Sequence, residues 1–380
     1  MHYRKFGELD WKPSALGFGA MRLPYEGDER GDIKENESIK MIRYAIDHGV
    51  NYIDTAWPYH DKESEKLVDK ALKDGYRDKV KIATKMPSWE IEKVKDLDHY
   101  LNKQLEKLET NHIDFYLLHA LSRKHWETYQ NLEKDVFQWM KEKRDEGKIS
   151  YLGFSFHDDL DMFKEIVDTY DWDFCQIQYN YLDQKFQAGR EGLKYAHSKG
   201  LGVIIMEPLR GGKLAKEPPG SIKNIWKKAD KDWSPVEWAL RWLWDQPEVS
   251  LVLSGMSTLD QVKENVDIAA DSGIDRLSDK DLKIVDEVAE KYREISPVEC
   301  TGCNYCMPCP NDVAITSNFS LYNQAEIYDE YEENKEKYME RLSEKKRASA
   351  CVKCGQCEEA CPQNLPIMDL MDEVTEYFED

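Results

Sequence analysis

The sequence predicts an α/β protein: a barrel of eight parallel strands alternating with helices, followed by a smaller, mainly helical domain that binds metal. Short apolar runs rich in β-branched residues alternate with stretches whose apolar residues recur at helical spacing. The chain has 380 residues, which is comfortable for two domains. Eight of its nine cysteines fall in two tight groups between Cys300 and Cys361.

Eight runs are predicted to be strands because they are almost continuously apolar, as strands covered on both faces are. They are Ala15–Gly19, Asn51–Ala56, Val80–Lys85, Ile113–Ala120, Ser150–Phe156, Phe174–Asn180, Gly202–Pro208 and Ser250–Met256. Eight strands that are each followed by a helix favour a closed (β/α)8 barrel of TIM type, and an open doubly wound sheet is the alternative. Residues 3–13, ahead of the first strand, are expected to form a small hairpin.

The segments between the strands are predicted to be helices because their apolar residues recur every three or four positions. They cover residues 38–46, 63–74, 94–108, 124–146, 159–169, 187–199, 234–245 and 259–270. One more helix is expected from Ser278, which resembles the start of a capping box, to about Glu294. Ser296-Pro297 then interrupts the helical pattern. The predicted domains are therefore residues 1–295 and 296–380.

The charge and the N-terminal sequence restrict the partners and the location. With 74 acidic and 53 basic residues, the formal net charge is −21. Nucleic acids and anionic membranes both attract proteins through concentrated Lys and Arg, so we expect neither as a partner. No apolar run approaches a membrane span, and the first residues, Met1 to Phe6, lead into polar sequence. We therefore expect a cytoplasmic protein.

The grouped cysteines indicate metal rather than disulfides, because a reducing compartment disfavours disulfides. The first group has two residues between successive cysteines, and the second has two, two and three. The groups are Cys300, Cys303, Cys306 and Cys309, and Cys351, Cys354, Cys357 and Cys361. Each run ends in Cys-Pro. Two zinc sites built from pairs of cysteines are the alternative, but two four-cysteine runs that end in Cys-Pro favour iron–sulfur clusters.

The two runs resemble those of two-cluster ferredoxins, in which the fourth cysteine of each run binds the other cluster. The resemblance implies two [4Fe-4S] clusters with exchanged fourth ligands. Their ligands would be Cys300, Cys303, Cys306 and Cys361 for one cluster, and Cys351, Cys354, Cys357 and Cys309 for the other. The shorter last spacing of the first run leaves this exchange open. The segment between the runs, predicted to be a charged helix over residues 323–347, resembles the helical ferredoxin module of respiratory reductases.

Four polar residues lie at the carboxyl ends of the second, third and fourth predicted strands or in the loop after the second. Barrel enzymes place their catalytic groups at these strand ends. They are Asp54, Tyr59, Lys85 and His119. The run from Gly49 to Ala56, followed by Tyr59 and Ser64-Glu65, closely resembles the aldo-keto reductase signature, and Lys85 and His119 complete the tetrad of that family. The resemblance covers about residues 3–295. The whole chain resembles the aldo-keto reductase subgroup that carries a C-terminal ferredoxin-type extension.

The resemblance implies carbonyl reduction by hydride from NAD(P)H, with Tyr59 as general acid. A tyrosine hydroxyl has a pKa of about 10 and is a weak acid at neutral pH. The ammonium of Lys85 is expected to lower that pKa, with Asp54 holding Lys85 in place. His119 is expected to orient the substrate oxygen. The structural alternative is a buried Asp54–Lys85 ion pair and a core histidine without a catalytic role.

The resemblance also implies a cofactor groove along the strand ends. Ser155 and Gln176 match the contacts of the nicotinamide amide, and Met206 stands where an aromatic ring commonly stacks. Matches to the pyrophosphate loop and then to the adenosine end are Leu209, Arg210 and Gly211, and Ser254, Gly255, Gln261, Glu264 and Asn265. Gly255 and Gln261 replace the Lys and Arg of many NADP-preferring members, and a 2′-phosphate attracts such cations. NADP, NAD and a flavin therefore all stay open.

Three functions are compatible with these two domains. The first is a reductase of a small carbonyl substrate whose clusters are structural or exchange electrons with a partner. The second is an electron-transfer enzyme in which the barrel holds a flavin or another redox cofactor supplied by a ferredoxin or a similar protein. The third is a non-catalytic redox-sensing module. A nicotinamide moves electrons in pairs and a cluster moves them singly, so direct coupling needs a further one-electron carrier.

Overall fold

The computed structural model describes all residues of the chain except 28–30, 133–135, 301, 303–305 and 362–363. The described residues divide into two compact units. The barrel unit comprises residues 1–216 and 233–278, and the C-terminal unit comprises residues 217–232 and 279–380. The boundary expected between residues 295 and 296 stays a prediction. In the described part of the chain, we find no helix with the length and apolar character that crossing a membrane requires.

Eight parallel strands close the predicted barrel in sequence order, with β8 pairing to β1. They are β1 Leu16–Gly19, β2 Tyr52–Asp54, β3 Lys81–Met86, β4 Ile113–Leu121, β5 Ile149–Phe156, β6 Phe174–Gln178, β7 Gly202–Met206 and β8 Leu251–Gly255. Almost every strand residue is buried, which explains why the sequence reads as continuous apolar runs rather than as an alternating pattern. The closed barrel is confirmed, and the open sheet is excluded.

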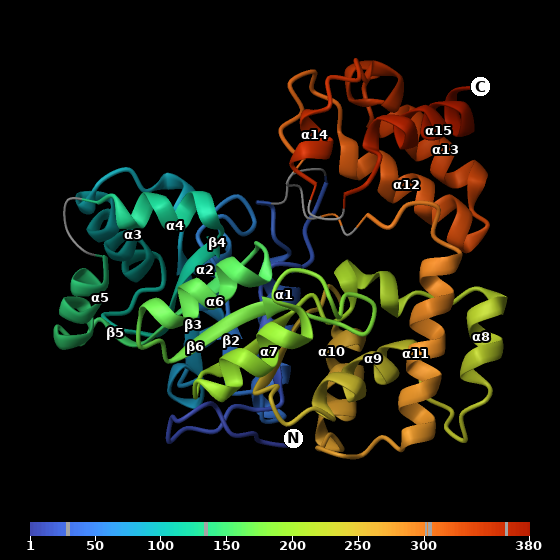
Figure 1. Ribbon diagram of the computed structural model, residues 1–380. Helices are drawn as coiled ribbons and strands as arrows, with labels where there is room; N and C mark the ends of the chain where they lie inside the picture. The colour runs from blue at the N-terminus through green and yellow to red at the C-terminus, as the bar shows by residue number, and fades with distance from the viewer. Residues whose placement is uncertain (28–30, 133–135, 301, 303–305, 362–363) are drawn as a thin grey trace. The chain divides into compact units, whose positions relative to one another are not determined.

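Helices surround the strands of the barrel unit (Figure 1). They are α1 Glu35–Asp47, α2 Ser64–Leu72, α3 Val94–Lys107, α4 Arg123–Gln130, α5 Val136–Asp145, α6 Leu160–Thr169, α7 Gly189–Ser198, α9 Pro235–Trp244 and α10 Leu259–Ala270. Short 3-10 turns follow at η1 Arg77–Lys79, η2 Ser88–Glu90 and η3 Arg210–Ala215. The single helix predicted over residues 124–146 is wrong, because α4 ends at Gln130 and α5 starts at Val136.

The predicted N-terminal hairpin covers the amino ends of the strands. It is a hairpin of isolated bridges, Tyr3 to Ser14 and Phe6 to Leu9. The Phe6 ring enters the barrel and lies 5.5 Å from the ring of Phe115 and 6.0 Å from that of Phe174, measured between centroids. All three rings are completely buried. The hairpin therefore fills the lower end of the barrel with aromatic side chains.

Arg4 ties this hairpin to a segment far along the chain. Its guanidinium is buried and donates to the backbone oxygens of Trp244, Gln246 and Val249 at 2.7, 2.7 and 2.8 Å. A guanidinium has five N–H donors and no acceptor, so backbone carbonyls are suitable partners for it when buried. The three bonds hold the hairpin to the end of α9 and to the segment that leads into β8.

The C-terminal unit is helical in its described residues. Its elements are α8 Gly220–Trp226, α11 Asp279–Glu294, α12 Ile315–Tyr328, α13 Tyr331–Arg341, η4 Glu344–Lys346, η5 Ala348–Ala350, α14 Gln356–Glu359 and α15 Ile367–Glu379. The helix predicted to end near Glu294 is confirmed as α11. The helical stretch predicted over residues 323–347 is not one helix, because α12 ends at Tyr328, Asp329 follows with φ +56°, and α13 begins at Tyr331.

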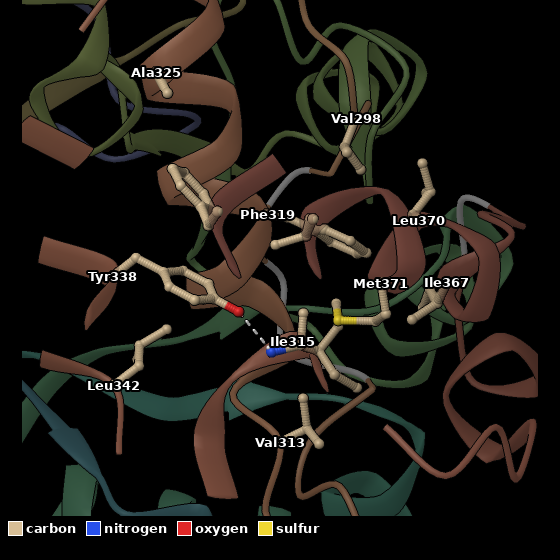
Figure 2. Packing of buried hydrophobic residues seen from close by; sticks show 13 residues of the cluster. Val298, Val313, Ile315, Phe319, Ala325, Tyr338, Leu342, Ile367, Leu370 and Met371 are labelled. Carbon is tan, nitrogen blue, oxygen red and sulfur yellow. Dashed lines mark hydrogen bonds between the residues drawn. The ribbon is translucent and has the colours of Figure 1, made fainter. Parts of the chain in front are cut away.

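Apolar side chains of α12, α13 and α15 form the core that supports the cysteine-rich segments. Figure 2 shows Phe319, Met371 and Ile367 packed together with Ile315 beside them. The Tyr338 hydroxyl accepts a hydrogen bond from the backbone N–H of Ala348 at 2.9 Å and donates to Glu379 at 2.6 Å (Figure 2). The helices thus fix the backbone just ahead of the second cysteine run.

Replacing Gly202 by alanine should destabilise the barrel. A Cβ built at Gly202 lies 2.4 Å from the Phe6 ring, which is held by two other aromatic rings. We expect Gly202→Ala to lower the free energy of unfolding by about 1–3 kcal/mol through overpacking. Urea unfolding followed by circular dichroism measures the change. Gly220→Ala is the control, because a Cβ there meets nothing within 4 Å; equal effects of the two substitutions would contradict the steric explanation.

Candidate active site and cluster-binding segments

The ammonium of Lys85 lies at the centre of the barrel site. Its Nζ donates to Asp54 Oδ1 at 2.6 Å, to the backbone oxygen of Thr55 at 2.8 Å and to the Tyr59 hydroxyl at 3.4 Å. Lys85 is fully buried, and Asp54 is almost so. Both residues belong to neighbouring strands, β3 and β2, and Tyr59 lies in the loop that follows β2. Three of the four predicted catalytic residues are therefore in contact.

The charges of this group follow from burial and pairing. Burial opposes the charge on Lys85, but Asp54 and Tyr59 outweigh it and raise the pKa of the amine. Burial also raises the pKa of the Tyr59 hydroxyl, and the nearby Lys85 offsets only part of that rise. Lys85 thus lowers the pKa of Tyr59 as expected, but desolvation is the larger effect and the pKa lies above its usual value.

A distortion in β4 positions the fourth residue. The register between β4 and β5 shifts between Leu118 and Leu121, and Ala120 within that shift has φ +51°. The backbone N–H of Ala120 donates to Ser155 Oγ at 2.7 Å, and its backbone oxygen is 2.8 Å from Nδ1 of His125. A bulge redirects the side chains beside it. Here it redirects His119, the residue just before Ala120.

His119 faces Tyr59 across the site. The centroids of the two rings are 6.0 Å apart in an edge-on arrangement, and the ring of Trp89 lies 5.1 Å from that of His119. Burial, followed by the charge of Lys85, lowers the pKa of His119 well below its usual value. Its Nδ1 is buried without a hydrogen-bond partner among the described residues. The predicted tetrad is therefore brought together around one point, with a neutral imidazole.

The residues expected to contact a nicotinamide amide lie on adjacent strands. Ser155 of β5 and Gln176 of β6 are register partners. The Gln176 amide nitrogen donates to the sulfur of Met206 at 3.5 Å, while its Oε1 is buried with no partner in the described part of the chain. An unpaired buried acceptor is costly, so this oxygen suits a ligand that brings an N–H group.

The loop after β7 contains consecutive residues in the left-handed backbone conformation. Following Leu209, the φ angles of Arg210, Gly211 and Gly212 are +49°, +68° and +90°. A side chain at either glycine would be strained whatever the space. The Arg210 guanidinium pairs with buried Asp183 at 3.3 Å. The backbone N–H groups of Arg210 and Gly212 donate within the loop, to Glu207 at 3.1 Å and to Leu209 at 3.0 Å, and these bonds hold the turn.

The residues expected at the adenosine end gather around the end of β8 and the start of α10. Asn265 donates to Ser254 Oγ at 3.4 Å, and its Oδ1 is buried and lacks a partner within the described ranges. Gln261 accepts the backbone N–H of Ser257 at 2.8 Å, and Glu264 accepts from Ser234 at 3.1 Å. Gly255 is exposed at the end of β8. The barrel residues fit a dinucleotide, since two unpaired amide oxygens mark its expected ends.

Four cysteines line one cavity of the C-terminal unit. They are Cys309 from the first run and Cys351, Cys354 and Cys357 from the second, together with apolar residues such as Val313 and Met371. These are the four cysteines expected to hold one cluster with an exchanged ligand. Thiolates from two separate runs around one apolar cavity suit an iron–sulfur cluster. The donor set therefore fits the predicted group.

Of the four cysteines expected to bind the other cluster, the structure describes three. Cys300, Cys306 and Cys361 are partly buried and pack against the same helical core. The backbone N–H of Gly302 points at the sulfur of Cys300, with 3.4 Å between the two atoms. Cys303 lies outside the described residues. The remaining cysteine, Cys175, is buried in β6, and burial raises the pKa of its thiol, as expected for a small core residue.

Sequence reasoning missed two features of the barrel site. Trp89, 44% exposed, lies beside His119 from the 3-10 turn after β3. An exposed tryptophan close to a strand end could have been noticed. Glu207, directly after β7, has φ +54° and pairs with Arg22 of the loop after β1 at 3.2 Å. No local motif connects two residues so far apart in the chain.

Comparisons with known proteins agree with this geometry. Residues 15–290 match the profile described as "Aldo/keto reductase family", and residues 299–365 match that of a "4Fe-4S dicluster domain". L-galactose dehydrogenase of Arabidopsis thaliana is 26% identical over 318 residues, which are 77% of this chain and 96% of that protein. NADH-specific methylglyoxal reductase of Escherichia coli (strain K12) is 27% identical over 329 residues, 75% of this chain and 97% of that protein.

Among solved structures, an aldo-keto reductase of Bacillus halodurans in its holo form has a similar fold. The TM-score is 0.63 at 25% identity, and the alignment covers 76% of this chain and 96% of that one. The cysteine-rich segment is covered by the 4Fe-4S dicluster profile, which begins at residue 299.

The neutral state of His119 should make stability depend on pH. Since burial lowers its pKa, the folded chain binds fewer protons than the unfolded chain below pH ~6.5, so stability falls as the pH falls. The loss is at most ~1.4 kcal/mol per pH unit below pH ~6.5. We expect His119→Gln to reduce the drop in melting temperature between pH 7 and pH 5, with exposed His48→Gln as control. An unchanged pH dependence in His119→Gln would show that His119 is protonated in the folded state.

Proposed function

Because the chain belongs to the aldo/keto reductase family and carries a 4Fe-4S dicluster domain, we propose that it reduces a small carbonyl compound with Tyr59 as the proton donor. The chain is an oxidoreductase by family, and the proposal names the residues that act. The single observation that carries it is the contact of the buried Lys85 ammonium with the Tyr59 hydroxyl at 3.4 Å. The roles below follow from the hydrogen-bonding capacity of each group.

Lys85 determines where the hydroxyl proton of Tyr59 points. An ammonium has three donors and no acceptor, and Lys85 has three oxygen partners, one of which is the Tyr59 hydroxyl. The tyrosine oxygen therefore accepts from Lys85, and its own proton is free for a substrate oxygen. As that proton leaves, the ammonium stabilises the phenolate that forms, and Asp54 keeps the ammonium charged.

His119 supplies a second hydrogen bond to the same oxygen. Its imidazole is neutral, so only one ring nitrogen carries a proton. A buried lone pair without a partner is better tolerated than a buried N–H without one, which favours the proton on Nε2 rather than on the unpaired Nδ1. His119 then donates to the carbonyl oxygen and holds it beside Tyr59. Trp89 provides an apolar wall next to the ring.

We propose that residues at the carboxyl ends of β5 to β8 and at the start of α10 hold a nicotinamide dinucleotide, which supplies the hydride when bound. Gln176 and Ser155 would hold the amide, Met206 would lie under the ring, and the loop from Leu209 to Gly212 would receive the phosphates. The unpaired oxygens of Gln176 and Asn265 support this assignment because each needs an N–H donor.

Among nucleotides, we propose that NADH is preferred to NADPH. Ser254 and Asn265 bond to each other, and Gln261 is engaged with the backbone of Ser257, so these side chains present amide and hydroxyl groups. Gly255 contributes no side chain, and the carboxylate of Glu264 would repel a 2′-phosphate. The Escherichia coli relative, an NADH-specific methylglyoxal reductase, agrees with this preference.

We propose that the C-terminal unit binds two [4Fe-4S] clusters with exchanged fourth ligands. Support comes from the cavity in which Cys309 joins Cys351, Cys354 and Cys357. The second cluster would then use Cys300, Cys303, Cys306 and Cys361. Such clusters carry electrons one at a time when bound. Reduced thiolates are kept in the cytoplasm, which supports that location.

A cluster-linked electron-transfer function is the second candidate. Cys354 is exposed where it lines the cavity, and Val352 beside it is 61% exposed, so a small one-electron carrier protein can approach this edge. A flavin in the barrel would be needed to join one-electron and two-electron chemistry. Iron and flavin assays on the same anaerobically purified sample separate the two candidates, since the reductase needs no flavin.

Tyr59→Phe should abolish carbonyl reduction, because it removes the proton donor and leaves the pocket otherwise filled. We expect a loss of at least about 10²-fold in kcat. The assay follows the absorbance of NADH or NADPH with methylglyoxal and other small aldehydes, while cluster absorbance is recorded on the same sample. Tyr195→Phe, at a partly exposed tyrosine on α7 that is bonded to Asp168, is the control. Retained turnover in Tyr59→Phe removes this residue from the proposed role.

The exchanged ligands can be tested by counting iron. Cys309→Ser and Cys351→Ser should each lose one cluster, about four iron atoms of about eight. If both cysteines bind the same cluster, the double variant Cys309→Ser/Cys351→Ser loses no more iron than either single variant, whereas Cys309→Ser/Cys300→Ser loses nearly all. The reverse pattern would mean that each run holds its own cluster. Cys175→Ala is the control with full iron content.

A further inference from the structure

The backbone that follows Tyr59 is strained. His60, Asp61 and Lys62 have φ angles of +51°, +52° and +75°. Three consecutive residues other than glycine in the left-handed region persist only where their surroundings hold them. The segment connects Tyr59 to Ser64, the first residue of α2. Whatever holds this segment also determines where the Tyr59 hydroxyl lies.

Lys107, near the end of α3, holds the last strained residue. Its Nζ donates to the backbone oxygen of Lys62 at 2.8 Å and lies 3.9 Å from the centre of the Trp57 ring. The same ammonium is 3.5 Å from Oε2 of Glu65. Only 14% of the Lys107 side chain is exposed, so it is largely withdrawn from water. A desolvated ammonium with three partners is a firm anchor for the loop.

Glu65 links this anchor to the strand that carries Lys85. Its carboxylate is completely buried, and Oε1 accepts from Thr84 at 2.6 Å and from Gln104 at 2.9 Å. The Gln104 amide nitrogen also donates to the backbone oxygen of Lys85 at 2.9 Å. The hydroxyl of Tyr116 donates to the other end of the Gln104 amide at 2.7 Å, which fixes its orientation.

One buried network therefore contacts the backbone near both members of the proton-transfer pair, Tyr59 and Lys85. It contacts the loop after Tyr59 through Lys107, and it contacts β3 at Lys85 through Gln104. The Lys85–Tyr59 contact of 3.4 Å is the longest of the three that Lys85 makes. It is the contact that a small shift of the loop would break first.

We propose that Lys107 and Glu65 are positioning residues that fix the distance between the Tyr59 hydroxyl and the Lys85 ammonium. Neither touches a substrate; both act through the backbone of the residues that do. The inference rests on the proposed function, because it assigns a role in the same proton transfer. Displacements of about 1 Å in such a pair reduce the rate up to 10²-fold.

The test compares Lys107→Met with the wild type and with two other variants. We expect Lys107→Met to lower kcat about 10- to 100-fold with KM changed less than about threefold, since substrate contacts are untouched. The limb of the pH profile at which Tyr59 loses its proton should move to higher pH, because the ammonium is then farther from the hydroxyl. Lys107→Arg keeps the charge and should recover most of kcat. Lys103→Met is the matched control on α3, where exposed Lys103 pairs with Glu106.

A compensating substitution separates positioning from general damage. Glycine adopts the left-handed region without strain, so Lys62→Gly should partly restore kcat in the Lys107→Met background. If Lys107→Met does not fold, Lys107→Gln, which shortens the side chain and removes its charge, takes its place under the same criteria. Wild-type kcat and pH profile in the variant, or a change in KM alone, would overturn the inference.

Tyr59→Phe in the same assay keeps the two proposals distinguishable. If that variant is inactive, the proton donor stands, and the Lys107 variants report on positioning alone. If Tyr59→Phe is active, the proposed function fails before the network is considered.

Discussion

A buried positive charge is the constraint on which the barrel site depends. An ammonium removed from water must be surrounded by acceptors, and Lys85 meets that demand with Asp54, the Thr55 carbonyl and the Tyr59 hydroxyl. Because the charge sits on one strand and its partners on the next strand and loop, the closed register of the barrel fixes their geometry. The bulge at Ala120 then adds His119 to the arrangement from the following strand. Removing any acceptor would leave an uncompensated charge in the interior, so the site resists partial change.

The same logic explains why polar side chains penetrate so deeply at the carboxyl ends of the strands. Glu65 is wholly buried and would be unfavourable alone, yet Thr84, Gln104 and Lys107 satisfy it. At the opposite end of the barrel, aromatic rings pack around Phe6, and buried Asp114 at the start of β4 pairs with Arg77 and Lys81. Buried charges are therefore paired at both ends of the barrel, and the predicted catalytic residues lie at the carboxyl end.

The sequence predicted all eight strands because parallel strands covered on both faces consist of nearly continuous apolar residues, as in Phe174–Gln178. Short motifs also singled out Asp54, Tyr59, Lys85 and His119, which the fold brings together, while their catalytic role and the role of the grouped cysteines stay predictions. It failed where the local sequence has no glycine or proline to end a helix. Asn131 does not distinguish one long helix from α4 and α5, and Asp329 does not mark the end of α12. The amphipathic helix α15 went unpredicted beside the more conspicuous cysteines. The rise in the pKa of Tyr59 could not be read from motifs, because desolvation depends on neighbours that only the fold supplies. Lys107 and Glu65 likewise meet only after α2 and α3 pack together.

The three bonds from Arg4 have a consequence for synthesis of the protein. Their acceptors lie 240, 242 and 245 residues farther along the chain. A ribosome adds about 5–20 residues per second, so the N-terminal segment waits roughly 12–50 s before its acceptors exist. During that interval the Arg4 guanidinium lacks its three acceptors, and the nascent barrel lacks β8 and keeps two open sheet edges. Closure of the barrel is therefore a late event in the synthesis of the chain.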